Sequence, residues 1–303
     1  MDVRRLELLR ELADRGSITA VATATNRTAS AVSQQLKVLE REAGIALTER
    51  RGRGIVLTGA GRMLAQTATD VAVALQRADA LWENFKQAPQ GEVTLTTFPT
   101  AGQMLLPGVL RAVASVPGLK LTCSDQDPLL PDFADLTADF DIVVADAPRI
   151  LPSWRERGIT VVKLLTEPLD VALPEGHPLA EKSSLSPRDI IGEPWVSAPE
   201  GFPYDLILEQ IEAVAGQKAD VRQRFRSNDI VEAIVADGHG IAILPRFTTR
   251  DHENGLTTRP LTGVATQRVI SALMRPDRAE RPSVRAVVEI LRAEGANVQA
   301  AHA

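Results

Sequence analysis

The chain has 303 residues, which is enough for two or three domains with hydrophobic cores of their own. Hydrophobic residues make up 44% and charged residues 24%, the balance of an ordinary globular protein. No apolar run approaches the ~20 residues that a membrane-spanning helix needs, and charges interrupt the N-terminal stretch MDVRRLELLRELADRG, so we expect no secretory signal and a cytoplasmic protein. The single cysteine, Cys123, excludes an intrachain disulfide and a cysteine-cluster metal site.

Charge is distributed unevenly along the chain. The net charge is −5, but residues 1–59 hold ten Lys and Arg against seven Asp and Glu. This segment therefore carries +3 and the remainder −8. A basic head on an acidic body is typical of a protein that touches DNA at one end only.

The first 45 residues predict three helices. Apolar positions at helical spacing indicate a helix over 3–14, which Gly16 can end in the left-handed conformation. Ser17 is a candidate N-cap for a short second helix with small residues on one face. Asn26 tolerates a tight turn, Thr28 can cap a third helix over 29–42, and Gly44 ends it. This order predicts a helix-turn-helix.

The third helix has the composition of a DNA-reading helix. Its buried stripe is Val32, Leu36 and Leu39. The opposite stripe is polar and then basic, with Ser30, Ser33, Gln34, Lys37 and Arg41. Ser and Gln side chains can bond base edges, and Lys and Arg can hold phosphates.

Residues 47–58 predict a hairpin with an arginine-rich tip, because two extended stretches flank Gly52 and Gly54. Arg50, Arg51 and Arg53 would contact phosphates if this hairpin is the wing of the helix-turn-helix. The alternative is an ordinary solvated loop.

Residues 16–22 (GSITAVA), 28–40 (TASAVSQQLKVLE), Gly44, Arg50 and 57–61 (LTGAG) resemble the N-terminal domain of LysR-type transcriptional regulators. The resemblance runs ungapped over some sixty residues and departs from the family at Val21, Thr25 and Thr48, where the family usually has alanine, leucine and phenylalanine. It assigns 1–60 to a winged helix-turn-helix domain. The expected DNA-binding residues are Thr28, Ser30, Ala31, Ser33, Gln34, Lys37, Arg50, Arg51 and Arg53.

A long linker helix is predicted from about residue 61 to 87, within a segment 61–88. Its apolar residues alternate in steps of four and three, which is the heptad pattern of two paired helices. The resemblance agrees, because the family pairs through this helix. The alternative is a helix that lies on its own domain. The expected dimerisation residues are Leu64, Ala68, Val71, Leu75, Ala78, Trp82 and Phe85.

The remaining two hundred residues predict an α/β fold with mainly parallel sheets. Strand-like runs are 93–97, 119–123, 141–144, 161–165, 169–173, 221–225, 241–244 and 269–274. Helical runs between them are 104–115, 129–136, 206–215, 230–236 and 283–292.

Two lobes joined by crossing strands are expected in this half. Residues 176–180 (GHPLA), Asp189 and 235–245 (VADGHGIAILP) are similar to markers of the LysR effector domain, which has a periplasmic-binding-protein type II fold. We expect 92–163 with 267–303 to form lobe I and 164–266 to form lobe II. Ligands of such folds bind between the lobes, near the carboxyl ends of strands.

The strand over 93–97 runs into a helix start, where free N–H groups and a hydroxyl would suit a carboxylate. The resemblance implies effector contacts from this segment, from the 200–204 loop and from Asn228. Each residue alone could equally be a helix cap or turn. No arginine cluster is apparent, so the expected ligand is a small metabolite with one carboxylate and an apolar body, with Arg149 as a possible cation. The expected effector-binding residues are Thr97, Phe98, Pro99, Thr100, Phe202, Tyr204 and Asn228.

The leading hypothesis is a homodimeric or homotetrameric transcription regulator that binds double-stranded promoter DNA, responds to a small molecule and contacts RNA polymerase. The alternatives are a constitutive DNA-binding protein without effector, and a solute-binding protein or enzyme built on the α/β half. No histidines have metal-ligand spacing and no catalytic motif is present, so we expect no metal, no cofactor and no enzyme. The acidic stretch over 125–141 is expected to be a solvated loop with helix caps, and the alternative is a metal or cation site.

Overall fold

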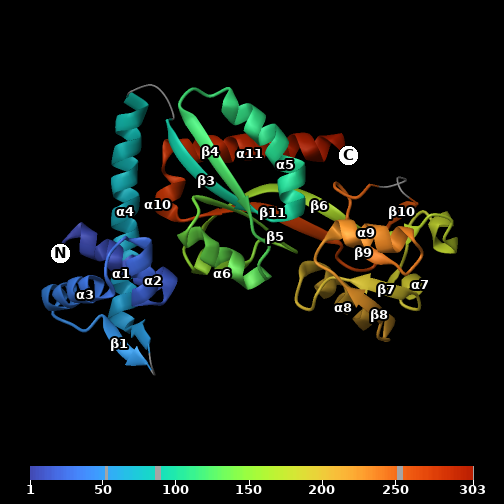
Figure 1. Ribbon diagram of the computed structural model, residues 1–303, viewed down its shortest axis with the longest axis horizontal. Coiled ribbons are helices and arrows are strands. Elements are labelled where there is room, and N and C mark those ends of the chain that lie inside the picture. Colours follow the sequence, from blue (N-terminus) through green and yellow to red (C-terminus); the bar gives the residue numbers. More distant parts are fainter. Residues whose placement is uncertain (52–53, 86–89, 251–254, 303) are drawn as a thin grey trace.

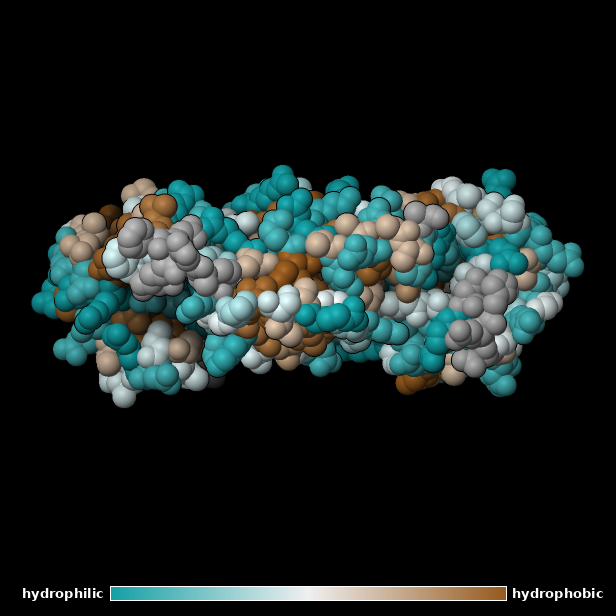
Figure 2. Space-filling model, turned by 90° about the horizontal axis from the view of Figure 1, so that it is seen from above, coloured by the Kyte–Doolittle hydropathy of each residue, from teal (hydrophilic) through white to brown (hydrophobic). Residues whose placement is uncertain are grey.

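The computed structural model describes residues 1–51, 54–85, 90–250 and 255–302, with the backbone alone for 83–85. The proposed wing residue Arg53 and the side chain of Phe85 therefore lie outside the described residues. The molecule is elongated: a small helical domain lies at one end, two lobes follow one another toward the other end, and α4 rises beside the first lobe (Figure 1). Seen from above, hydrophobic residues gather most densely near the middle of the molecule (Figure 2).

The N-terminal domain confirms the predicted winged helix-turn-helix. Gly16 ends its first helix with φ of 65°, and the side chains of Ser17 and Thr28 cap the next two helices. The two strands form an antiparallel hairpin in which Thr48 pairs with Leu57. The elements are α1 (Val3–Arg15), α2 (Ile18–Ala24), α3 (Ala29–Ala43), β1 (Thr48–Arg51) and β2 (Gly54–Leu57).

The wing is fixed against α3 by Glu40. Its carboxylate accepts hydrogen bonds from the backbone N–H of Leu47 and Thr48 and from the Thr48 hydroxyl, at 2.9–3.0 Å. The threonine that replaces the family's usual phenylalanine therefore makes a polar contact here. Gly61 closes the domain, since a Cβ at this position would lie 2.0 Å from the carbonyl oxygen of Leu47.

The linker helix α4 (Gly59–Phe85) lies on its own domain along one side. Ala65 and Ala68 are buried in the hydrophobic core of the winged domain. Farther along, Ala80 is buried where α4 packs on the short helix α10 (Pro276–Ala279). The helix thus contacts two separate parts of its own chain.

The first lobe is built on a β-sheet that has helices on both of its faces. Its core includes Val93, Ile142 and Val287 from three elements distant in sequence. The long helix α11 packs against α5 and β6. The other elements are β3 (Gly91–Thr97), α5 (Pro99–Ala114), β4 (Leu119–Asp125), the 3₁₀ helix η1 (Leu130–Ala138), β5 (Ile142–Ala147), α6 (Pro152–Glu156), β11 (Gln267–Met274) and α11 (Pro282–Ala301).

The second lobe has two hydrophobic clusters of its own, one around Trp195 and Ile211 and one around Val196 and Val235. The short strands β7 and β10 were not among the predicted strand-like runs. The elements are η2 (Pro178–Glu181), α7 (Pro187–Ile190), β7 (Pro194–Ser197), α8 (Pro203–Ala215), β8 (Asp220–Arg224), α9 (Asn228–Ala236), β9 (Ala242–Pro245) and β10 (Leu256–Pro260).

The lobes are joined by β6 (Thr160–Pro174) and β11, which run antiparallel. β6 pairs with β11 in the first lobe and with β9 and β10 in the second. The prediction of two separate strands over 161–165 and 169–173 is wrong, since β6 is one continuous strand. The expectation of mainly parallel sheets is also wrong: β3–β4, β3–β5 and β7–β8 are parallel, whereas all pairs of the crossing strands are antiparallel. β6 carries the chain from the first lobe to the second and β11 carries it back, so the two strands run in opposite directions.

A network of buried charges attaches the winged domain to the first lobe, and we call it the docking network. It joins Arg10, Glu11 and Arg15 on α1 to Arg275 and Asp277 at α10. Arg275 bonds Glu11 at 2.7 Å, and Arg10 bonds Asp277 at 2.9 Å. Arg15 bonds Glu11 at 2.7 Å and donates to the carbonyl oxygen of residue 138, at the end of η1, at 2.9 Å. All but Arg15 are buried.

Candidate DNA-binding surface and effector cleft

The outer face of α3 presents most of the predicted DNA-reading side chains to solvent. Gln34 and Lys37 are exposed, and their side chains make no hydrogen bond with any described residue. Ser30 is exposed beside the capping Thr28, with their hydroxyls 3.1 Å apart, whereas Ala31 and Ser33 are half-buried. A helix with unpaired polar groups on its open face suits the major groove.

The wing extends this surface. Arg50 and Arg51 are exposed on β1 opposite Ile55 and Gly54, and no ion pair joins either arginine to the described part of the chain. Because Glu40 ties the hairpin to α3, these guanidiniums and the outer face of α3 belong to one rigid unit. Such a unit can meet bases and phosphates together.

The predicted dimerisation stripe on α4 is divided. Ala68 is buried in the core of the winged domain, Leu64 packs against that core, and Val71 is half-buried. Leu75 is 47% exposed and Ala78 is exposed, as is Trp82 at the far end. The first part of the stripe thus serves the chain's own domain, and the second part presents apolar surface to solvent.

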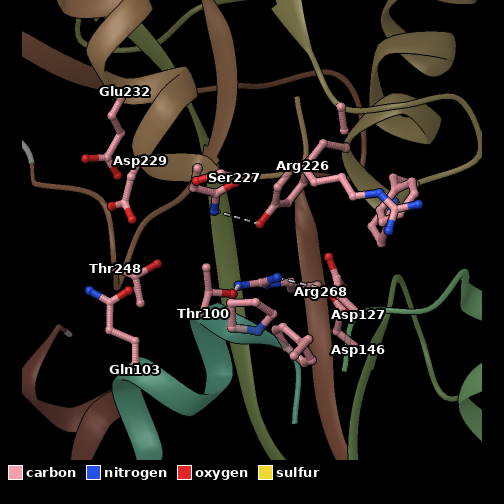
Figure 3. Close-up of a pocket in the computed structure, with 17 residues that line it drawn as sticks. Thr100, Gln103, Asp127, Asp146, Arg226, Ser227, Asp229, Glu232, Thr248 and Arg268 are labelled. Carbon is pink, nitrogen blue, oxygen red and sulfur yellow. Dashed lines mark hydrogen bonds and ion pairs between the residues drawn. The ribbon is translucent and has the colours of Figure 1, made fainter. Parts of the chain in front are cut away.

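A cavity of about 320 Å³ lies between the two lobes (Figure 3). Six of the seven predicted effector residues line it: Phe98, Pro99, Thr100, Phe202, Tyr204 and Asn228. Thr97 does not. Its hydroxyl donates to the carbonyl oxygen of Phe98 and its methyl group packs against Gly102, so the side chain is buried beside the start of α5.

Arg268 forms the floor of the cavity, where two carboxylates bond its guanidinium. It bonds Glu167 at 2.7 and 2.9 Å and Asp146 at 3.0 Å, and it donates to the Thr100 hydroxyl at 2.8 Å. Burial disfavours the charge, but Tyr204 and the two carboxylates outweigh it and raise the pKa of Arg268 above its ordinary value. Arg268 therefore joins β5, β6 and α5 at the crossing of the lobes and holds Thr100 in place.

Other charged side chains line the walls. Asp127 and Asp146 lie on one side of the view in Figure 3, with Arg226 above them, and Asp229 and Glu232 lie on the other side. Arg250 bonds Asp229 at 3.1 Å and Glu232 at 3.4 Å. The expectation that Arg149 supplies a cation is wrong, because that side chain is exposed and does not line the cavity.

Tyr204 and Asn228 meet at the second lobe's wall. The amide of Asn228 donates to the Tyr204 hydroxyl at 3.4 Å. Burial raises the pKa of Tyr204 to about 12, so its hydroxyl stays protonated and can donate to a ligand.

Sequence reasoning missed Asp127, Arg226 and Arg268. Each lies in or beside a loop or strand end whose own pattern carries no signal. Only the fold brings them together, since Arg268 bonds Glu167 across 101 residues of chain. Asp146, by contrast, comes two residues after the predicted strand run 141–144 of the first lobe, at a strand end where cleft residues are expected.

Two family models account for nearly the whole chain. Residues 3–62 match the bacterial regulatory helix-turn-helix protein of the lysR family, and residues 86–296 match the LysR substrate binding domain. The chain belongs to the LysR family of transcriptional regulators. It is therefore a DNA-binding transcription regulator with a two-lobed, periplasmic-binding-protein-like effector domain, as the sequence indicated.

Relatives across the family are similar over most of their length. The probable nitrogen assimilation transcriptional activator of Synechococcus elongatus is 28% identical over 290 residues, covering 94% of this chain and 92% of the relative. The transcriptional activator protein LysR of Escherichia coli is 29% identical, covering 93% and 89%. In structure, a full-length OxyR variant from Pseudomonas aeruginosa matches with a TM-score of 0.62 and 19% identity over 96% of this chain and 98% of that one. Full-length CbnR in complex with target DNA matches with a TM-score of 0.53 and 19% identity, over 97% and 100%.

Members of this family are generally regulators rather than enzymes, and LysR regulators are oligomeric. Within the described ranges, no group of His, Cys, Asp and Glu is arranged to hold a metal ion. In the same ranges, every helix is too short or too polar to span a membrane.

Proposed function

We propose that this protein binds promoter DNA as a homodimer or homotetramer, and that its affinity for that DNA changes when a small molecule enters the cleft. The observation that carries this proposal is the cavity between the lobes, whose wall comes from both lobes. A ligand that touches both lobes favours one arrangement of them over others. A constitutive DNA-binding protein would have no use for such a site.

The DNA contacts are assigned to α3 and the wing. Ser30, Ser33 and Gln34 read base edges, with Thr28 and Ala31 beside them at the start of the helix. Lys37, Arg50, Arg51 and Arg53 hold phosphates. Gln34, Lys37, Arg50 and Arg51 are exposed and their side chains have no hydrogen-bond or ion-pair partner among the described residues, which supports the assignment.

Assembly is assigned to the exposed part of α4, from Leu75 to Trp82, with Leu64, Ala68, Val71 and Phe85 completing the stripe. A second copy of α4 would cover the apolar surface that this helix leaves open. Two winged domains brought together in this way read two half-sites.

The effector domain is divided into lobe I, residues 92–163 with 267–303, and lobe II, residues 164–266. The separate hydrophobic cores support this division. Ligand contacts are assigned to Phe98, Pro99 and Thr100 from lobe I and to Phe202, Tyr204 and Asn228 from lobe II. Because its target is DNA and its output is transcription, we place the protein in the cytoplasm, in contact with RNA polymerase.

The proposal is tested by selecting genomic fragments with the purified full-length protein. The recovered fragments should share one inverted-repeat motif, and Gln34→Ala should lose it. Mass spectrometry of the purified protein should in parallel detect a bound small molecule that Ser227→Trp excludes, since Ser227 lines the cavity and its side chain bonds no described residue. Fragments without a common motif would contradict the proposal.

A further inference from the structure

Two charged side chains of the cleft, Asp127 and Arg226, lack an ion pair with any described residue. Asp127 lies in the loop after β4 and is half-buried, and no described donor bonds its carboxylate. Arg226 lies just before α9, where its guanidinium carbon is 4.9 Å from the centroid of the Phe202 ring. Asp127 belongs to the first lobe's wall and Arg226 to the second lobe's wall.

The remaining charges of the cleft are satisfied within the protein. Arg268 is held by Glu167 and Asp146, and Arg250 by Asp229 and Glu232. Each arginine is bonded to two carboxylates, so each cluster carries one surplus negative charge and offers a ligand no free cation. Asp127 and Arg226 are thus one unpaired anion and one unpaired cation on the same cavity.

Aromatic side chains line the same cavity as these charges. Phe98 and Phe202 line the cavity, and Tyr204 adds a third ring. Phe98 and Tyr204 also cover the Arg268 guanidinium, which lies 5.0 and 5.7 Å from their centroids. An apolar body in the cavity would therefore pack on rings, with polar groups only at defined positions.

We propose that the effector is a zwitterionic amino acid or close analogue, whose ammonium group binds Asp127 and whose carboxylate binds Arg226. This rests on the proposed function and narrows its ligand class. A monocarboxylate, which the sequence alone suggests, would leave the half-buried Asp127 without a partner of opposite charge, and a simple amine would offer no anion to Arg226, whose side chain is exposed at the cavity. A ligand with both charges pairs with both side chains at once, and these lie on the same side of the cavity (Figure 3).

The test is calorimetric titration of the full-length protein with the twenty protein amino acids and, for each one that binds, with its deaminated and decarboxylated counterparts. At least one amino acid with an apolar or aromatic side chain should bind about tenfold more tightly than either counterpart, as expected for a charged hydrogen bond. Asp127→Asn and Arg226→Gln should each weaken this binding about tenfold.

Matched controls separate local from general effects. Asp125→Asn changes an exposed carboxylate two residues from Asp127, and Arg222→Gln changes an exposed guanidinium four residues from Arg226; neither residue lines the cavity. Both controls should bind the amino acid like the unaltered protein. Equal losses in a control and in its partner variant would overturn the assignment of charges.

The outcomes distinguish this inference from the proposed function. If no amino acid binds, or if a deaminated carboxylate binds as tightly as its parent, the zwitterion is excluded. If that carboxylate also changes affinity for the selected DNA, the protein remains a ligand-responsive regulator with another ligand class. If an amino acid binds but DNA affinity does not change, the ligand class holds and the proposed control of DNA binding fails.

Discussion

Arg268 and Arg275 lie at the two ends of one strand, and each is buried among carboxylates. Arg268, near the start of β11, forms the floor of the cleft, and Arg275, directly after the end of β11, bonds Glu11 of the winged domain. Seven residues of extended strand place them about 23 Å apart. A ligand that shifts β11 at the cleft would therefore act on the docking network through a single stiff element.

The first prediction concerns this network. Arg275→Gln removes one partner of a buried ion pair, leaves Asp14 without a cationic partner among the described residues, and leaves Glu11 with Arg15 alone. The change should cost about 3–5 kcal/mol of docking or folding stability. Small-angle scattering should show the winged domain released from the first lobe, with a larger radius of gyration. Arg285→Gln, an exposed arginine on α11, should change neither stability nor shape; an unchanged shape in Arg275→Gln as well would show that α4 alone holds the domain.

Docking should also depend on acid pH. Burial opposes ionisation of both carboxylates, but Arg275 and Arg15 outweigh it at Glu11 and lower its pKa from 4.5. At Asp277, Arg275 and Arg10 outweigh it and lower the pKa from 3.8. A lowered pKa in the docked state means that stabilisation is present above those ordinary values and is lost as pH falls through the lowered ones. Asp14 acts in the opposite sense, because burial raises its pKa. Scattering between pH 7 and 3 should show release only below about pH 4, whereas release near neutral pH would contradict the assignment.

The second prediction concerns DNA reading. Gln34→Ala should reduce the binding free energy for the selected DNA site by about 1–3 kcal/mol, because a contact with a base edge is lost. It should also reduce discrimination between bases at that position. Arg51→Ala should weaken binding to all DNA sequences alike, and it should reduce the slope of log affinity against log salt concentration by about one. Fluorescence anisotropy at several salt concentrations measures both effects, with Arg111→Ala on α5 as an exposed control. An unchanged preference in Gln34→Ala would mean that another surface reads the DNA.

The third prediction concerns assembly. Leu75→Asp should loosen the oligomer and reduce affinity for the full operator, because it places a charge in the apolar surface of α4. Leu110→Asp, which places the same charge on an exposed leucine of α5, should leave assembly intact. Sedimentation velocity measures the mass of each variant. An intact oligomer with native operator affinity in Leu75→Asp would place the interface elsewhere.

The fourth prediction is the pH dependence of ligand binding. Burial and the neighbouring Asp146 raise the pKa of Asp127, against the lowering effect of Arg226 and Arg268. An ammonium group needs the ionised carboxylate, so affinity for the amino acid should fall as pH decreases through this raised pKa and stay constant above it. Titrations in buffers of different ionisation enthalpy should show proton release on binding in that range. Asp127→Asn should remove the dependence, and a dependence that survives in that variant would implicate another group.

Local pattern was sufficient for the winged domain. Its helices bury regular apolar stripes, and Ser17, Thr28, Gly16 and Gly44 mark their ends, so each boundary could be read from a few neighbouring residues. For the cleft, the resemblance to the LysR family, together with helix starts that follow strand ends, located six lining residues.

Local sequence pattern was not sufficient where a residue's environment depends on partners far away in the chain. Glu167 and Pro168 resemble a break between strands, but Glu167 is fully buried because Arg268 and the backbone of Phe247 bond it. The partner that makes a charged residue acceptable inside β6 lies a hundred residues away. The α4 stripe was divided in a way that local pattern could not predict. A heptad pattern does not tell whether Ala68 packs on another chain or, as here, on its own domain.

The central claim is that occupation of the cleft controls DNA binding. It is tested most directly by the equilibrium affinity for the selected operator, measured with and without the low-molecular-mass fraction of a cell extract. The unaltered protein and the exposed control Ser184→Trp should show a change in operator affinity, whereas Ser227→Trp, whose indole fills the cavity, should show none. The same response to the extract in Ser227→Trp as in the unaltered protein would contradict the claim.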